Sequence, residues 1–344
     1  MCGTTLEKQK VERLYFGLAL EAQKQITFNL QHPKKQVIVI AGPTGCGKSA
    51  FALALAEKIG GEIVSADSMQ VYRGMDIGTA KPTQEERLKV PHHLIDIKDI
   101  SENFNVVDFY YEARQACQAI LSRNNVPIVV GGSGFYLHSL IFGPPVGPPS
   151  VPEIRKKIEG EMEKRGSENL YEQLRQFDPE YASTVTKSDK QKIIRALEII
   201  ELTGKKVSKL AWKSKVKPLS YNFHCWFLTR ERDHLYRRID KRCERMLQEG
   251  LIDEVRQLEK EGIRENPSTA QAIGYRQALN YLATAQTESD YHQFVEAFKR
   301  ASRNYAKRQL TWFRREHLFR WLDLDLHDDD LAQDIIYQDL NNLR

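Results

Sequence analysis

The stretch that decides the fold reads Gly42-Pro43-Thr44-Gly45-Cys46-Gly47-Lys48-Ser49, and it directly follows the apolar run Val37-Ile38-Val39-Ile40. It matches the P-loop pattern GxxxxGK[ST], with a short strand before it and a helix-forming run after it. In such a loop, glycines let backbone N–H groups turn toward phosphate oxygens, and the N-terminus of the helix adds partial positive charge. Lys48 supplies a full charge, and the Ser49 hydroxyl can ligate Mg²⁺. The chain is therefore predicted to bind a phosphorylated ligand.

The bulk composition is typical of a soluble globular protein. At 344 residues and a net charge of +5, the chain is long enough for about two domains. No apolar run approaches the roughly 20 residues of a membrane helix, and the N-terminus lacks the apolar centre of a secretory signal. The cysteines are scattered, with no CxxC pair: Cys2, Cys46, Cys117, Cys225 and Cys243. We therefore expect reduced thiols, a cytoplasmic location and no membrane partner.

Positive charge is concentrated in two segments of the second half of the chain. The first contains Lys205, Lys206, Lys209, Lys213, Lys215 and Lys217. The second contains Lys299, Arg300, Arg303, Lys307, Arg308, Arg314, Arg315 and Arg320. Together the segments favour a polyanionic partner, although either segment alone is equally typical of solvated surface.

Alternating strand and helix patterns predict the fold class. Strands are expected at residues 37–40, 62–66, 94–97 and 126–130, and helices at 50–59 and 106–122. This alternation is typical of an α/β protein, here a P-loop NTPase-like parallel sheet flanked by helices. A Pro- and Gly-rich run at 143–149 interrupts the pattern, and charged helical sequence follows it.

We therefore predict a core interrupted by an inserted all-helical domain. A strand at 223–228 resumes the core, and long helices follow at 233–249 and 291–315. In the last helix a core-facing stripe is indicated at helical spacing by Phe294, Phe298, Ala301 and Tyr305. The expected divisions are an N-terminal extension (1–35), the first part of the core (36–145), the inserted domain (146–218), the second part of the core (219–322) and an acidic C-terminal tail (323–344).

Polar residues end two of the expected strands. Asp67 follows the second strand, and because ligands of open α/β sheets bind at the carboxyl ends of the strands, it is expected in the same crevice as the P-loop. The alternative role is a helix or turn cap. The fourth strand ends in Gly131-Gly132-Ser133-Gly134, without the aspartate that often helps to hold Mg²⁺ in nucleotide hydrolases. This difference argues against simple nucleotide hydrolysis.

The motifs resemble those of the tRNA dimethylallyltransferase (tRNA isopentenyltransferase) family. GPTGCGKS at 42–49 is similar to the family's GPTASGKS or GPTASGKT, and DSMQVYRGMDIGTAKPT at 67–83 is similar to its DSxQxYxGMDIGTAKP. PHHLIDI, GGSGFYL, QKIIRALEI, AIGYRQ and KRQLTWFR appear in the family's order and spacing. The resemblance covers about residues 37–321.

This resemblance implies transfer of a dimethylallyl group from dimethylallyl diphosphate to the exocyclic amino group of the adenine immediately 3′ of the anticodon. The P-loop would then hold pyrophosphate through Gly42, Pro43, Thr44, Gly45, Cys46, Gly47, Lys48 and Ser49. Arg232 is implied as a further pyrophosphate ligand, Ser49 as the Mg²⁺ ligand and Asp67 as the base. Lys48 would stabilise the leaving group, and Ser133 stands where the family usually has threonine.

The remaining matching segments are implied tRNA contacts. The anticodon stem-loop would be held by Asp67, Ser68, Met69, Gln70, Ser133, Arg155, Gln191, Lys192, Ile193, Ile194, Arg195, Gln271, Ala272, Ile273, Gly274, Tyr275, Arg276, Lys307, Arg308, Gln309, Leu310, Thr311, Trp312, Phe313 and Arg314. Basic side chains would bind phosphates, and Tyr275 or another ring would stack on a base. The inserted domain would hold the stem, and we expect a monomer.

Three other functions compete with this interpretation. A small-molecule or nucleotide kinase using ATP explains the P-loop but leaves the basic helices without a role. An adenylate isopentenyltransferase would perform the same chemistry on a free nucleotide, without need of a basic inserted domain. A nucleotide-gated RNA-binding protein without catalysis would leave Asp67 in the phosphate crevice without a purpose.

Overall fold

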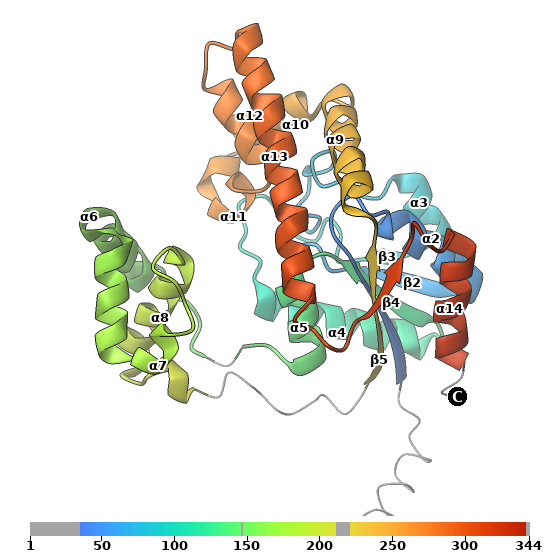
Figure 1. Ribbon diagram of the computed structural model, residues 1–344, viewed down its shortest axis with the longest axis horizontal. Coiled ribbons are helices and arrows are strands. Elements are labelled where there is room, and N and C mark those ends of the chain that lie inside the picture. The colour runs from blue at the N-terminus through green and yellow to red at the C-terminus, as the bar shows by residue number, and fades with distance from the viewer. Residues whose placement is uncertain (1–34, 146, 211–220, 342–344) are drawn as a thin grey trace, which may run out of the picture. The chain divides into compact units, whose positions relative to one another are not determined.

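The computed structural model describes residues 35–145, 147–210 and 221–341, and its strands form one six-stranded parallel sheet in the order β3-β2-β4-β1-β5-β6 (Figure 1). The central strand β1 is buried from Val37 to Ala41 and pairs in register with β4 at Ile38–Ile128 and with β5 at Ile38–His224. The predicted α/β class with a parallel sheet is confirmed. The strands are β1 (Lys35–Ala41), β2 (Gly61–Ser65), β3 (His92–His93), β4 (Val126–Gly131), β5 (Tyr221–Thr229) and β6 (Arg320–Asp323).

Helices connect the strands and continue after β5. They are α2 (Lys48–Ile59), α3 (Gln84–Lys89), α4 (Val106–Ser122), α5 (Gly134–Phe142), α6 (Pro152–Phe177), α7 (Pro179–Ala182), α8 (Lys190–Thr203), α9 (Arg232–Gln248), α10 (Leu251–Lys260), α11 (Pro267–Ala270), α12 (Tyr275–Leu282), α13 (Glu288–Phe313) and α14 (Asp329–Asn341). No helix in the described ranges is long and apolar enough to cross a membrane.

The chain divides into two compact units. The first contains the sheet and, within the described residues, spans 35–104, 112–134 and 221–341; the second spans 105–111 and 135–210. The second unit therefore includes residues on the N-terminal side of the boundary predicted at 146. The predicted N-terminal extension and residues 211–220, with three of the lysines of the first basic segment, lie outside the described residues.

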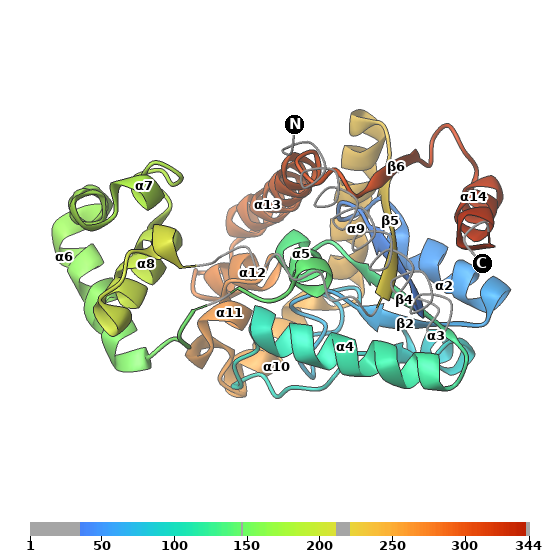
Figure 2. The same cartoon turned by 90° about the horizontal axis from the view of Figure 1, so that it is seen from below.

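In the first unit, a layer of helices stands at the carboxyl ends of the strands. Helices α9 and α13 lie side by side in both ribbon views (Figures 1 and 2), and ion pairs join them. Arg303 of α13 contacts Asp240 of α9 at 2.6 Å, and Lys299 contacts Glu244 at 2.7 Å. The two helices are therefore fixed to each other above the edge of the sheet where ligands bind in this architecture.

The second unit has its own hydrophobic core. Helix α6 changes direction at Gly166, whose φ of 81° lies in the left-handed region, and it packs against α8. Leu170, Leu174 and Ile193 are buried in this core. The all-helical composition predicted for the inserted segment agrees with these elements.

Two local predictions are corrected by the structure. The strand expected at 94–97 does not form, because Leu94 and Asp96 take positive φ values of 63° and 56°, and the short β3 precedes them. The segment predicted as an acidic tail forms α14, whose Ala332, Ile336 and Leu340 are buried. Helix α14 lies beside α2 in both ribbon views, and an ion pair of 2.6 Å between Lys58 and Asp334 joins the two helices (Figures 1 and 2).

The apolar stripe of α13 is partly as predicted. Phe294 and Phe298 are buried, but the buried face then continues through Ser302 and Ala306. From Phe294 to Ala306 the buried face advances in steps of four residues and therefore drifts around a helix of 3.6 residues per turn, which leaves Ala301 and Tyr305 half-buried. Both side chains line cavities instead.

Candidate functional site

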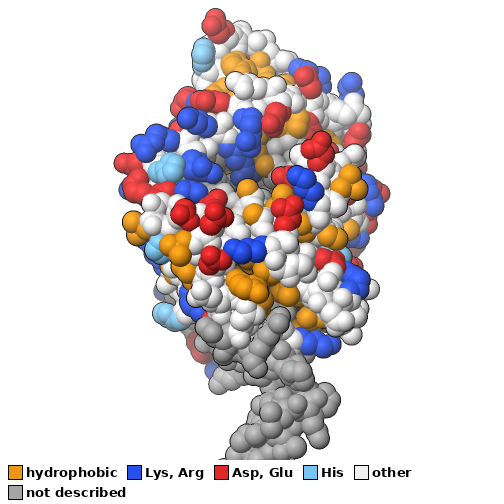
Figure 3. All heavy atoms as spheres, turned by 90° about the vertical axis from the view of Figure 1, so that its right-hand side faces the viewer, with side chains coloured by type: hydrophobic (Ala, Val, Ile, Leu, Met, Phe, Trp, Pro, Cys, Tyr) orange, Lys and Arg blue, Asp and Glu red, His pale blue; other side chains and the backbone are white. Residues whose placement is uncertain are grey.

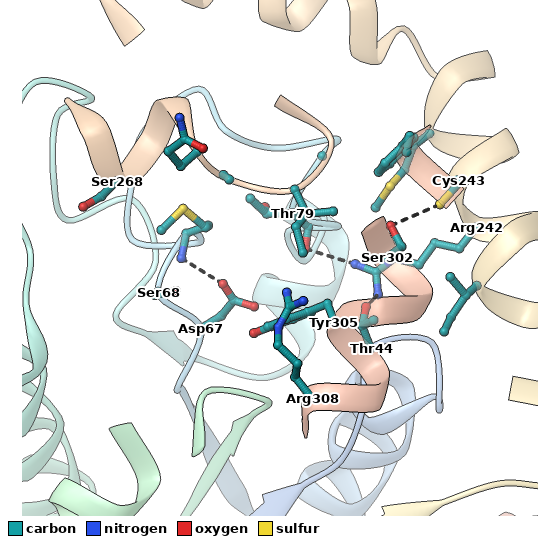
Figure 4. A pocket seen from close by; sticks show the side chains of 18 residues that line it. Thr44, Asp67, Ser68, Thr79, Arg242, Cys243, Ser268, Ser302, Tyr305 and Arg308 are labelled. Carbon is teal, nitrogen blue, oxygen red and sulfur yellow. Dashed lines mark hydrogen bonds between the residues drawn. The ribbon is translucent and has the colours of Figure 1, made fainter. Parts of the chain in front are cut away.

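A crevice of about 310 Å³ opens at the carboxyl ends of the strands within the first unit (Figure 4). It is bounded by the P-loop, by the residues after β2, and by helices α9 and α13. Its polar lining includes Thr44, Asp67, Thr79, Arg242, Tyr305 and Arg308. Its other walls are apolar, with Ile239, Met246 and Phe298 among them. The crevice thus combines an anion-binding loop with an apolar lining.

The P-loop has the backbone that its glycines predict. Gly45 and Gly47 take φ values of 82° and 105°, and α2 begins directly afterwards at Lys48. Burial lowers the pKa of the Lys48 ammonium, and Arg242 adds to this effect while Asp67 opposes it. A bound anion would favour the charged form of Lys48, because its negative charge would offset the desolvation of the ammonium by burial. The loop is therefore built to hold an anion.

Three arginines of the segment after β5 hold the P-loop in place, and sequence reasoning missed them. Arg230 Nε donates to the Cys46 carbonyl at 2.8 Å, and Arg238 Nε donates to the Gly45 carbonyl at 2.9 Å. Arg242 Nη1 donates to Thr44 Oγ1 at 2.9 Å, and burial lowers the pKa of its guanidinium while Asp67 opposes this. The spacing of four between Arg238 and Arg242, on the helix that follows β5, is the signal that could have found two of them.

Arg232, the arginine selected from the sequence, lies elsewhere. It is the first residue of α9, it is exposed, and its guanidinium sits over the Tyr236 ring at 5.3 Å. It is not among the residues that line the crevice. The ligand role of Arg232 stays a prediction. The arginines that are hydrogen-bonded to the P-loop are Arg230, Arg238 and Arg242.

On the face shown in Figure 3, lysine and arginine side chains gather around a recess in its upper half.

Asp67 projects into the crevice directly after β2. Its Oδ1 accepts the Met69 N–H at 2.8 Å, so it also forms the turn cap that was the alternative role. Among the described residues, no hydrogen bond is recorded to its Oδ2. One carboxylate oxygen therefore fixes the side chain, and the other is available to a ligand.

Tyr305 of α13 lies close to both Asp67 and Ser133. Its hydroxyl is hydrogen-bonded to the Ser133 side chain, and in Figure 4 it points toward Asp67. Burial, followed by the charge of Asp67, raises the pKa of Tyr305 to about 12, so its proton is retained at neutral pH. Ser133 thus reaches the site through Tyr305, which the sequence placed in the core stripe.

Gln309 connects α13 to the P-loop. Its Oε1 accepts the Thr44 N–H at 2.8 Å, and its Nε2 donates to the Gly132 carbonyl at 3.0 Å. A Cβ atom at Gly132 would lie 2.0 Å from Gln309 Nε2, so a larger residue there would displace the Gln309 amide. The side chain is 5% exposed, and its predicted contact with tRNA stays a prediction.

Other predicted tRNA contacts divide into exposed and buried residues. Ser68, Met69, Gln271, Ala272, Ile273 and Arg308 line the crevice. Lys307, Thr311 and Arg314 are exposed, and Trp312 is 41% exposed beside Gly134. Leu310 is half-buried, and Gln70 bonds to Ser65 Oγ at 2.8 Å.

Some of the predicted contacts serve packing instead. Tyr275 is fully buried and donates its hydroxyl to Glu254 Oε1 at 2.6 Å, and burial raises its pKa, so it cannot stack on a base. Glu254 also accepts the backbone N–H of Ile77 at 2.7 Å, which holds the loop that carries Thr79. Phe313 is buried as well, and Gly274 adopts a φ of 91° at the start of α12.

In the second unit, two of the predicted contacts, Arg155 and Arg195, are half-buried and bonded to their neighbours. Arg195 contacts the buried Glu198 at 2.7 Å, and Arg155 Nη2 donates to Gln191 Oε1 at 2.5 Å. Lys192 is exposed. Ile193 and Ile194 are buried in the core of this unit, and their predicted contact with tRNA stays a prediction.

The residues present fit a magnesium ion that is held mainly by its ligand. In the ranges that the structure describes, no group of three or more His, Cys, Asp or Glu side chains could hold a metal ion. Ser49 lies in the first turn of α2, and Mg²⁺ commonly takes only one or two protein ligands beside phosphate oxygens and waters. The Ser49 hydroxyl, in the phosphate-binding loop pattern, meets that requirement.

Comparisons with known proteins agree with this geometry. A model of the IPP transferase family matches residues 70–316. A tRNA dimethylallyltransferase of Protochlamydia amoebophila (strain UWE25) is 65% identical over 333 residues and covers 97% of both chains. One of Chlamydia pneumoniae is 54% identical over 306 residues, covering 88% of this chain and 89% of the relative.

Solved structures are similar too. The full-length tRNA isopentenylpyrophosphate transferase from Bacillus halodurans superposes with a TM-score of 0.66 at 40% identity, covering 90% of this chain and 97% of the other. A eukaryotic dimethylallyltransferase acting on tRNA gives a TM-score of 0.73 at 30% identity, covering 90% of this chain and 80% of the other. The chain therefore belongs to the IPP transferase family.

Proposed function

We infer that the protein is a tRNA dimethylallyltransferase that transfers the dimethylallyl group of dimethylallyl diphosphate to the exocyclic amino group of the adenine immediately 3′ of the anticodon. The observation that carries this proposal is the meeting of Asp67 with the P-loop in one partly apolar crevice. The names of the relatives support the same activity. Isopentenyladenosine in tRNA and pyrophosphate are the products.

The donor would bind with its diphosphate on the P-loop. The loop amides, Lys48 and the α2 N-terminus would stabilise negative charge as the allylic C–O bond breaks. Ser49 would hold Mg²⁺, which when bound supplies further charge neutralisation of the diphosphate. The apolar walls near Ile239 and Phe298 suit the five-carbon prenyl group better than water.

Asp67 would act as the base. The adenine amino nitrogen is a poor nucleophile because its lone pair is delocalised into the ring, so it needs orientation and removal of a proton. In the transfer, the nitrogen bonds to the allylic carbon, the carbon–oxygen bond of the donor breaks, and the amino proton moves to Asp67. Oδ2 is the oxygen we assign to this proton, because Oδ1 already accepts the Met69 N–H.

The adenine would have to leave its stack to reach this position. Enzymes that modify a base inside folded nucleic acid extrude it into the active site. Met69, Ile273 and Arg308 border the crevice and would contact the extruded nucleotide. We further propose that the protein works as a cytoplasmic monomer, an expectation consistent with the four free, buried thiols of Cys46, Cys117, Cys225 and Cys243.

Labelled dimethylallyl diphosphate tests the proposal. The purified protein with Mg²⁺ should transfer label to a synthetic anticodon stem-loop carrying adenine at the target position. Parallel reactions contain free AMP in place of the RNA, or labelled ATP in place of the donor. Transfer to AMP but not to the stem-loop would indicate an adenylate isopentenyltransferase, and phosphoryl transfer from ATP would indicate a kinase.

A further inference from the structure

A second cavity, of about 330 Å³, lies between α12 and α13 in the first unit. Its rim carries three arginines and two asparagines: Arg276, Arg300, Arg308, Asn280 and Asn304. Ala297 and Ala301 also line it. Every charged group in its lining is a cation.

The arginines of this groove differ from the cations on the neighbouring face of α13. There, Arg303 and Lys299 are neutralised by Asp240 and Glu244 of α9. Within the described residues, by contrast, Arg300 has no recorded hydrogen bond or ion pair. Arg276 makes one long bond of 3.3 Å to Gln271, and Arg308 lies over the Tyr305 ring at 5.6 Å. Three uncompensated guanidinium groups around one hollow repel one another unless an anion binds between them.

The groove adjoins the catalytic crevice. Ile273 and Arg308 line both cavities. A strand whose adenine enters the crevice beside Asp67 would therefore lay its neighbouring backbone in the groove. Guanidinium and amide groups supply the donors that phosphodiester oxygens require, and arginine matches phosphate geometry in a bidentate manner.

We propose that this groove is a phosphodiester subsite for the RNA backbone next to the target adenosine, with Arg300 as its central ligand. The proposal rests on the proposed function and extends it to residues outside the motifs that suggested tRNA contacts. Asn280 and Asn304 complete the donor set from the two sides of the groove. A phosphate held here would fix the register of the loop while the adenine is extruded.

The test compares Arg300→Gln with Lys260→Gln in the full chain. Lys260 is exposed, ends α10 and lines neither cavity, so its substitution removes the same charge elsewhere. The dissociation constant of a synthetic anticodon stem-loop is measured over a series of salt concentrations. Arg300→Gln should weaken binding roughly tenfold and reduce the salt slope by about 0.7 to 0.9, the value of one phosphate contact. Lys260→Gln should leave the slope unchanged.

A second arm locates the phosphate. Stem-loops are prepared with a single neutral methylphosphonate linkage, moved one position at a time through the loop. At one position, the neutral linkage should weaken RNA binding by the unaltered protein and cause no further loss of RNA binding by Arg300→Gln. An unchanged salt slope, or no linkage coupled to Arg300, overturns the proposal.

Inhibition by inorganic pyrophosphate distinguishes a subsite for the RNA backbone from a site for small anions. Its inhibition constant should be the same for Arg300→Gln and the unaltered protein, and a change in that constant without a change in RNA binding also overturns the proposal. Thermal melting of each variant verifies folding. Failure of the unaltered protein to prenylate the stem-loop would instead defeat the proposed function itself.

Discussion

Replacement of Gln309 by methionine should weaken use of the prenyl donor without weakening RNA binding. The amide joins Thr44 N–H and the Gly132 carbonyl through bonds of 2.8 and 3.0 Å, and methionine keeps the length of the side chain while removing both. Each bond contributes about 1 kcal/mol net, so the loss of about 2 kcal/mol corresponds to roughly a thirtyfold fall in kcat/KM for the donor. Because Gln309 is 5% exposed, the RNA dissociation constant should stay within about twofold.

Steady-state kinetics with varied dimethylallyl diphosphate and filter binding of the stem-loop measure the two quantities. Lys307→Gln is the matched control, two residues earlier and exposed on the same helix. It should give the opposite pattern, with weaker RNA binding and an unchanged KM for the donor. If Gln309→Met lowered RNA affinity in parallel with donor use, the side chain would be an RNA contact after all; if neither quantity changed, its bridge to the P-loop would be unimportant.

Three further predictions concern the base, its neighbour and acid stability. Asp67→Asn should retain stem-loop binding and lose turnover by orders of magnitude in single-turnover assays; near-normal turnover removes Asp67 from the role of base. Tyr305→Phe removes the hydroxyl bonded to Ser133 and should lower kcat roughly tenfold with little change in the donor KM, and an unchanged kcat would make that hydroxyl a bystander. Glu62 is 3% exposed and bonded to Arg123, Asn125 and His93, and these bonds lower its pKa to about 2 although burial opposes them. Because its folded pKa is below the ordinary 4.5, the contribution of Glu62 to the free energy of unfolding is present above pH 4.5 and is lost as pH falls toward 2. Glu62→Gln should therefore flatten the acid side of a stability–pH curve from chemical denaturation. Curves of equal slope for the two proteins would contradict this.

The sequence was most informative where a local motif determines local geometry. The P-loop glycines require left-handed backbone, and Gly45 and Gly47 have it. Asp67 could be placed because the end of a parallel strand is set by topology alone. The groups that hold the loop could not be placed in the same way, because Arg230, Arg238 and Gln309 contact it across more than 180 positions of sequence.

Other differences arose where tertiary contacts decide the outcome. Helix α14 has an acidic sequence that is typical of a solvated tail, yet Asp339 pairs with the buried His224 at 2.8 Å and with Arg320 at 2.7 Å. Tyr305 has the spacing of a core residue, but the buried face of α13 drifts past it and its side chain lines the crevice. In both places the partner in space determined the structure.

The most direct test of the central claim is nucleoside analysis by mass spectrometry after reaction of the protein with dimethylallyl diphosphate and an anticodon stem-loop. The account predicts that a single adenosine, the one immediately 3′ of the anticodon, gains the five-carbon prenyl group at its exocyclic nitrogen, and that a stem-loop with guanosine there stays unmodified. A prenyl group at any other position, or equal modification of the guanosine stem-loop, would contradict it.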